Sequence, residues 1–146
     1  MTRFLLRSPL DMHLHLREGD ILRTVAPLSA QAFAGAVIMP NLVPPVDNRE
    51  RLERYRASIR AASAWAVFEP YMTLFFQPYD EPMLRGLRAQ ISGIKLYPTG
   101  VTTHSEAGVR AIEDATPTRP SCRSSIFRCS YTAKRTVLCS IASENF

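Results

Sequence analysis

The order of its apolar segments limits this 146-residue chain more than any other feature of its sequence. Short runs with the pattern of strands alternate with stretches in which apolar residues recur at helical spacing. The expected strands are residues 9–16, 36–39, 69–76 and 91–97, and the expected helices are residues 24–34, 47–62, 81–90 and 105–114. A regular alternation of strand and helix is typical of a parallel sheet built from βαβ units, so the sequence predicts an α/β fold.

The number of these units sets the expected architecture. About four units are present, whereas a closed barrel of eight units typically needs about 250 residues. The count is compatible with half of a (β/α)8 TIM-type barrel, incomplete as it stands, and the family resemblance given below implies that it is the N-terminal half. The clearest helix begins with Asp47 and Glu50, which have the spacing of a capping box, and apolar residues at 52, 55, 59 and 62 then fall on one face. Ser105 is expected to cap the last helix.

The net charge of +5 suggests a nucleic-acid partner only until its distribution is considered. Residues 1–114 hold 13 basic and 12 acidic side chains, while residues 115–146 hold five basic side chains and one acidic side chain. The body is therefore nearly neutral, and it has no stripe of basic and aromatic residues, so a small basic binding module is a remote alternative. No apolar run approaches the roughly 20 residues of a membrane span, and no export signal is recognised. We expect a cytoplasmic protein without nucleic-acid or membrane partners.

The chain changes character near Ala115. All six glycines precede this point, and all three cysteines follow it, at Cys122, Cys129 and Cys139. The spacing of these cysteines matches no zinc pattern, so free thiols are expected. Residues 115–146 also show no helical or strand period. We interpret residues 1–114 as the folded part and residues 115–146 as an aberrant, unstructured tail, and we hypothesise that a change of reading frame produced it.

Two histidines mark the end of the first expected strand. His13 and His15 are separated by one residue, so on a strand they point to the same side and can share one metal ion. Neutral imidazole is a favoured zinc ligand. An H-x-H pattern alone is equally compatible with two histidines at a strand end that make ordinary hydrogen bonds.

A lysine lies within the apolar strand Gly93–Tyr97. The chain contains sixteen arginines and only two lysines, so Lys95 suggests a need that a guanidinium group does not meet. With its pKa lowered by burial, its amine could react with carbon dioxide to give a carbamate that bridges two metal ions. The alternative is a lysine whose stem lies along the strand while its ammonium group reaches water.

Three segments together resemble class II dihydroorotases. They are HLHLR, MPNLVPPV and GIKLYPTGVTTHSEAGV, in the family's order and approximate spacing, and the resemblance covers about residues 9–114. It implies a (β/α)8 barrel with two zinc ions that catalyses the reversible cyclisation of N-carbamoyl-L-aspartate to (S)-dihydroorotate in pyrimidine (UMP) biosynthesis. The complete family enzyme is expected to be a homodimer.

The resemblance also implies roles for individual residues. His13 and His15 would bind the more buried zinc ion, and Lys95, carboxylated, would bridge both ions. Arg17 and Asn41 would hold the carboxylate of the small-molecule substrate, because a planar guanidinium pairs with a carboxylate through two hydrogen bonds and an amide adds a donor. A surface arginine and a turn asparagine are the alternatives.

The departures from the family are as informative as the match. Family members more often have asparagine at the position of His104, which we interpret as a loop residue rather than a metal ligand. Two further zinc-binding histidines, an aspartate that acts as general acid and base, and a substrate loop are expected beyond the matching region, so no catalytic acid or base is assigned here. A catalytically inactive fragment of a dihydroorotase is therefore the main alternative to an active enzyme.

Overall fold

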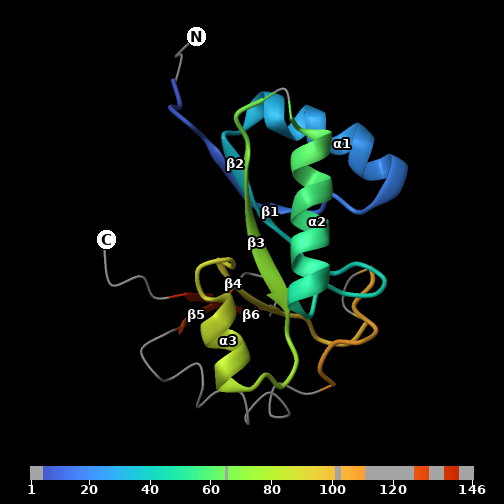
Figure 1. Ribbon diagram of the computed structural model, residues 1–146, viewed down its shortest axis with the longest axis vertical. Helices are drawn as coiled ribbons and strands as arrows, with labels where there is room; N and C mark the ends of the chain where they lie inside the picture. Colours follow the sequence, from blue (N-terminus) through green and yellow to red (C-terminus); the bar gives the residue numbers. More distant parts are fainter. Residues whose placement is uncertain (1–4, 65, 101–102, 111–126, 132–136, 142–146) are drawn as a thin grey trace.

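A computed structural model describes residues 5–64, 66–100, 103–110, 127–131 and 137–141, the last two ranges by their backbone alone (Figure 1). Its first part alternates strands and helices: β1 (Leu10–Leu14), α1 (Gly19–Ala32), β2 (Gly35–Ile38), α2 (Arg49–Ala62), β3 (Glu69–Phe75), α3 (Glu81–Leu87) and β4 (Gly93–Leu96). Strands β1 to β4 pair in parallel and in sequence order. The predicted α/β class is confirmed, and the four parallel strands with their helices form a curled half-barrel.

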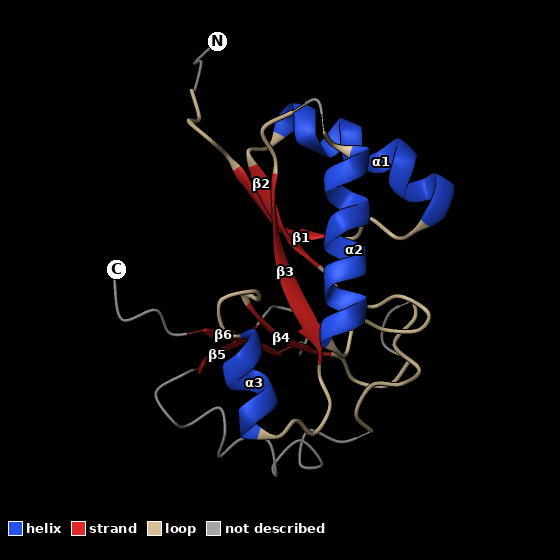
Figure 2. Ribbon diagram, viewed as in Figure 1, coloured by secondary structure: helices blue, strands red, loops and turns tan. Residues whose placement is uncertain are grey.

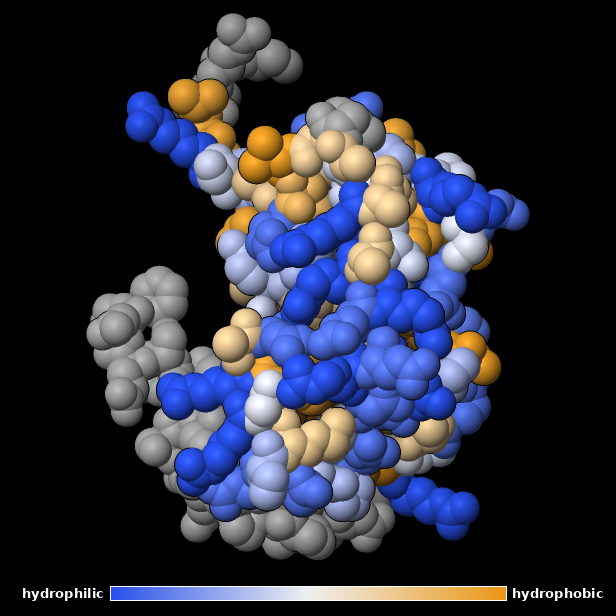
Figure 3. Space-filling model, viewed as in Figure 1, coloured by the Kyte–Doolittle hydropathy of each residue, from blue (hydrophilic) through white to orange (hydrophobic). Residues whose placement is uncertain are grey.

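The burial of the strands follows from their place in the sheet. Every residue of β2 and β4 is buried, whereas β1, the outermost strand, has a largely exposed pattern. Helix α2 lies along β3 (Figure 1), and its buried residues are Leu52, Tyr55 and Ile59. The core lies between the sheet and the helices and includes Leu16, Ile38, Leu52, Ile59, Leu74, Leu84 and Ile94. On the face that carries α2, the surface is mostly hydrophilic, with hydrophobic side chains near the N-terminal end (Figure 3).

Helix α2 begins one residue later than a capping box at Asp47 requires. The cap is Asn48, whose side chain accepts a hydrogen bond from the backbone N of Arg51 at 2.9 Å. The Asp47 carboxylate instead pairs with the Arg51 guanidinium at 2.5 Å. The predicted cap at Asp47 is wrong. Asp and Asn can both cap a helix, and here Asn48 has the extended backbone of an N-cap residue.

Two other helix boundaries differ from the prediction. Helix α1 starts at Gly19, five residues earlier than expected, although it contains Pro27 and its N-cap Glu18 makes no side-chain cap bond. The helix expected from Ser105 does not form over residues 105–110, which make turns, and residues 111–114 lie outside the described part. Val109 instead donates its backbone N–H to the Tyr97 carbonyl at 3.0 Å. It thereby forms an isolated parallel β-bridge with Pro98, in the segment after β4.

Two more strands lie in the segment for which the sequence predicts no regular element: β5 (Phe127–Tyr131) and β6 (Val137–Ile141) (Figure 2). Strand β6 pairs antiparallel with β4, and β5 pairs with β6, so the sheet has the order β1-β2-β3-β4-β6-β5. The hydrogen bonds between paired strands are made by backbone groups, so the pattern of apolar side chains in the sequence does not reveal them. The boundary at residue 114 and the origin of the tail stay predictions.

Candidate metal and substrate site

The two histidines come together at the end of β1. His13 lies on the strand, His15 follows it, and their Nε2 atoms are 3.2 Å apart with ring planes at 47°. Two nitrogen ligands of a tetrahedral zinc ion, each roughly 2.0–2.1 Å from the metal, lie roughly 3.3–3.4 Å apart. The spacing of the two nitrogens therefore fits a shared zinc ion.

His15 is held in the neutral form that binds metals. Its pKa is lowered to about 4, first by burial and then by the positive charges of His13 and Arg17. Lys95 acts in the same direction, which places the lysine charge within electrostatic reach of this ring. The Asn41 amide is close enough to oppose the shift, although His15 Nδ1 is buried and makes no hydrogen bond of regular geometry within the described residues.

Lys95 occupies the middle of β4 and is only 1% exposed. Burial lowers the pKa of its amine. Its Nζ lies 5.8 Å from the centre of the Tyr97 ring, and its backbone oxygen accepts from the N–H of Phe76 at the end of β3. The Lys95 side chain is thus buried on a strand that is paired on both sides. Its low exposure disfavours the alternative in which its ammonium group reaches water.

Arg17 and Asn41 lie beside each other at the same edge of the sheet. Arg17 donates from Nη1 to the backbone oxygen of Asn41 at 3.1 Å. The Asn41 side chain is buried; its Nδ2 donates to the Thr103 carbonyl at 2.7 Å and its Oδ1 accepts from the Tyr97 hydroxyl at 3.3 Å. Burial raises the pKa of Tyr97, which keeps this hydroxyl protonated as a donor. Three loops, after β1, β2 and β4, are therefore joined by one polar network.

His104 belongs to this network through Arg17. Its Nδ1 lies 3.4 Å from Arg17 Nη1. Both residues have positive φ angles, 60° for Arg17 and 59° for His104, in the left-handed region that non-glycine residues seldom adopt. No role was predicted for Tyr97, although it lies in the family-like segment with Lys95. Its hydroxyl bond to Asn41 spans 56 residues and leaves no local pattern.

The structure brings together some of the expected site and leaves the rest open. His13 meets His15, and Arg17 meets Asn41, while Lys95 approaches from β4. No group of three or more His, Cys, Asp or Glu side chains that could hold a metal ion occurs within the described part of the chain. Within the described ranges, the candidate metal ligands are thus two imidazoles and one lysine.

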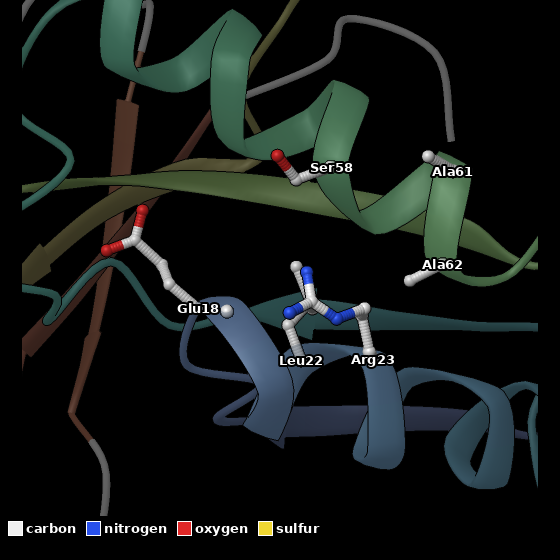
Figure 4. A pocket seen from close by; sticks show the side chains of 7 residues that line it. Glu18, Leu22, Arg23, Ser58, Ala61 and Ala62 are labelled. Atoms are coloured by element: carbon white, nitrogen blue, oxygen red, sulfur yellow. The ribbon is translucent and has the colours of Figure 1, made fainter.

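A cavity of about 400 Å³ lies elsewhere, between the start of α1 and the end of α2 (Figure 4). It is lined by Glu18, Gly19, Leu22, Arg23, Ser58, Ala61 and Ala62. None of these residues belongs to the histidine pair or to the arginine–asparagine network. The cavity therefore plays no part in the candidate site. No helix in the described ranges is long and apolar enough to cross a bilayer.

No family model matches the chain. Curated relatives include dihydroorotases from Shewanella pealeana, 40% identical over 120 residues, and from Chelativorans sp., 46% identical over 121 residues; each match covers 80% of this chain and 35% of the relative. The crystal structure of dihydroorotase from Campylobacter jejuni matches with a TM-score of 0.74 and 51% identity, over 78% of this chain and 34% of that one. The Saccharomyces cerevisiae dihydroorotase in complex with 5-fluoroorotic acid matches with a TM-score of 0.67 and 30% identity, over 77% of this chain and 32% of that one. The chain spans about a third of the length of these proteins.

Proposed function

We propose that this chain, which is homologous to the N-terminal part of dihydroorotase, supplies the first part of a zinc site for the reversible cyclisation of N-carbamoyl-L-aspartate to (S)-dihydroorotate. The observation that carries the proposal is the histidine pair, with Nε2 atoms 3.2 Å apart, within electrostatic reach of a buried lysine. A cytoplasmic location and a homodimeric complete enzyme are further parts of the proposal.

The proposed metal ligands are His13, His15 and Lys95. Zinc bound there would lower the pKa of a coordinated water and polarise the ring amide carbonyl. The neutral amine of Lys95 would form an N–C bond to carbon dioxide and release one proton, which leaves a carbamate with one negative charge and two oxygen ligands. Burial supports this reaction because it lowers the pKa of the amine and so increases the neutral fraction.

Arg17 and Asn41 are proposed to bind the substrate carboxylate. A guanidinium group has five N–H donors, and the two contacts of Arg17 to Asn41 and His104 both use Nη1, so donors on its other nitrogens can pair with a carboxylate. The Asn41 amide has two hydrogens on Nδ2, and the bond to the Thr103 carbonyl uses one of them. The network therefore orients both groups and leaves Arg17 donors for the ligand.

Two observations are compatible with the alternative of an inactive fragment. The chain covers 35% of its curated relatives, and its described residues contain no cluster of three or more acidic, histidine or cysteine ligands. We therefore expect the chain by itself to bind zinc through the histidine pair but to give no measurable hydrolysis of dihydroorotate.

The zinc assignment is tested by equilibrium dialysis with metal analysis on the purified chain. We expect His15→Ala to abolish the tightest zinc site and His104→Ala to leave it unchanged. Carboxylation of Lys95 is followed by NMR with 13C-labelled bicarbonate, where a carbamate signal should vanish in Lys95→Gln. Equal zinc binding by the parent chain and by His15→Ala would contradict the proposed site.

A further inference from the structure

Two consecutive residues of the segment after β4 contact the two groups proposed to bind the substrate carboxylate. The backbone carbonyl of Thr103 accepts from Asn41 Nδ2 at 2.7 Å. The next residue, His104, has its Nδ1 atom 3.4 Å from Arg17 Nη1. Arg17 and Asn41 themselves belong to the loops after β1 and β2. One short stretch of chain therefore contacts both of these loops where the carboxylate is expected to bind.

The contact with Arg17 defines the state of the His104 ring. A guanidinium nitrogen only donates hydrogen bonds, so Nδ1 of His104 accepts in this contact and carries no proton. The ring is then neutral, with its proton on Nε2. A neutral imidazole gives Arg17 an acceptor without placing a second positive charge beside it.

The hydrogen bonds of Arg17 determine which of its donors face a ligand. Nη1 carries two hydrogens, and it has two acceptors, the Asn41 carbonyl at 3.1 Å and His104 Nδ1 at 3.4 Å. Two acceptors on one nitrogen fix the plane of the guanidinium group. The donors that remain are on Nε and Nη2, which form one edge of the fork that pairs with a carboxylate through two hydrogen bonds.

The segment that carries His104 is itself held by hydrogen bonds at its base. Thr99 donates its backbone N–H to the Val109 carbonyl at 2.9 Å and its hydroxyl to the Gly108 carbonyl at 2.7 Å. Ser105, next to His104, is fully buried, and its carbonyl accepts from the N–H of Gly108 at 2.9 Å. A side chain at Gly108 would meet a backbone carbonyl at 2.3 Å, so this close packing requires glycine.

The backbone conformations of the two partners also indicate that the contact is specific. Arg17 and His104 are both half-buried, and both have positive φ angles. Such conformations cost free energy and persist where the surrounding structure imposes them. Asparagine, which the family resemblance gives for position 104, also tolerates positive φ and has an amide oxygen that can accept from Arg17.

We propose that His104 is a positioning residue for substrate binding, whose Nδ1 accepts from Arg17 and so presents the Nε and Nη2 edge of the guanidinium group to a small carboxylate ligand. This inference rests on the proposed function, because it requires that Arg17 binds the substrate carboxylate. A guanidinium group that keeps only the Asn41 carbonyl can swing about that one bond, and it then spends less time in the orientation that pairs with a carboxylate. The position thus requires an acceptor, and an imidazole is one group that supplies it.

The test measures the binding of dihydroorotate to the full 146-residue chain by NMR titration at about pH 8, where histidine is ordinarily neutral. We expect His104→Leu to raise the Kd at least about fivefold, because it removes the acceptor, and His104→Asn to stay within about twofold of the parent chain. Ala107→Leu is the matched control, since it places the same apolar side chain at an exposed position of the same segment. It should bind as the parent chain does.

A spectroscopic measurement separates positioning from a loss of structure. In the parent chain the 15N signals of the His104 ring should show an unprotonated Nδ1 and a protonated Nε2. The Arg17 Nε–H signal should be sharp in the parent chain and in His104→Asn, and it should broaden in His104→Leu as the guanidinium group loses its fixed plane. The backbone amide signals of β1 to β4 should be unchanged in all variants.

Three results would overturn the inference alone: an equal Kd for the parent chain and His104→Leu, an equally weakened Kd for His104→Asn and His104→Leu, or a proton on Nδ1 in the parent chain. Arg17→Gln tests the premise separately. If the parent chain does not bind dihydroorotate, or if Arg17→Gln binds it as the parent does, the proposed role of Arg17 is refuted and the inference is overturned with it.

Discussion

The two ends of the parallel sheet are finished differently. At one end β4 is covered by the antiparallel strand β6, and all four residues of β4 are buried. At the other end the residues of β1 are exposed or half-buried. A closed barrel has no edges, whereas half a barrel has two, and each must be paired, blunted or left open. Among the strands that the structure describes, the parallel part of the sheet has one paired edge and one open edge, although β1 and β4 come from the same kind of βα unit.

This difference extends to the candidate metal ligands. Lys95, on the paired strand, is buried and has a lowered pKa, while His13, on the open strand, is exposed. Ligand groups of similar expected function therefore meet water to different extents. The degree of cover at each edge sets how strongly the local groups are desolvated, and desolvation in turn controls whether an amine or imidazole is charged.

The largest expected effect comes from a matched pair of truncations, one inside the sheet and one at its open edge. Ile38, on β2, is fully buried, so Ile38→Ala should lower the free energy of unfolding by about 2–5 kcal/mol through lost burial and the cavity left behind. Met12→Ala, on β1, should change it by less than about 0.5 kcal/mol, because the side chain is already in water. Urea unfolding with an unchanged m-value measures both.

Similar losses in the two variants would remove the contrast between the edges. They would mean that Met12 is covered in solution, for example by a second copy of the chain. Dilution separates the two cases, because stability that depends on association falls with protein concentration and stability of a monomer does not.

The sequence predicted the sheet well because the sheet depends on local patterns. The apolar run 36–39 became β2, and the strand expected at 69–76 became β3, each within one residue of its predicted end. Buried parallel strands produce continuous apolar runs, and this signal needs no knowledge of distant parts of the chain. The expected helix from Ser105 failed for the opposite reason, since its backbone groups bond to the distant segment after β4.

From residue spacing alone, contacts within the candidate site were predictable only between neighbours in the sequence, and the pairing of Arg17 with Asn41 was expected from the family resemblance. His13 and His15 are two residues apart, and their approach follows from strand geometry. The contact between Arg17 and His104 spans 87 residues, and it requires a curled sheet that brings two loops together. The antiparallel pairing of β6 on β4 was not predicted because it depends on backbone groups that become available only when β4 forms an edge.

A smaller effect is expected from the titration of His15, which lies beside the open strand but is itself desolvated. Its pKa in the folded chain is about 4, against 6.5 for the ordinary group, so the unfolded chain binds more protons between these values. With zinc removed by a chelator, stability from this group should be fully present above about pH 6.5 and should fall as the pH drops toward 4. We expect a loss of about 1 kcal/mol, well below the full linkage value because the ring is only half-buried and solvent screens its charge.

The measurement compares the parent chain with His15→Asn, whose side chain does not titrate. The difference between their unfolding free energies should shrink as the pH falls from 7 to 4.5, while His104→Gln should track the parent chain. A difference that stays constant over this range would mean that His15 is as well solvated as His13, and the two residues would then both belong to the open edge.

The smallest change in stability is expected from a charge placed on the open edge. Met12→Lys should alter the free energy of unfolding by less than about 0.5 kcal/mol, since an exposed side chain is replaced by another. It should nevertheless reduce self-association, because a lysine on an edge strand opposes strand addition by a second chain. Val67→Lys adds the same charge at a site 93% exposed and away from β1, so it corrects for the general effect of charge on solubility.

If both variants reduce light scattering equally, the benefit comes from net charge alone, and β1 is no more prone to pairing than the rest of the surface. If only Met12→Lys reduces light scattering, the chains self-associate through the open edge of β1.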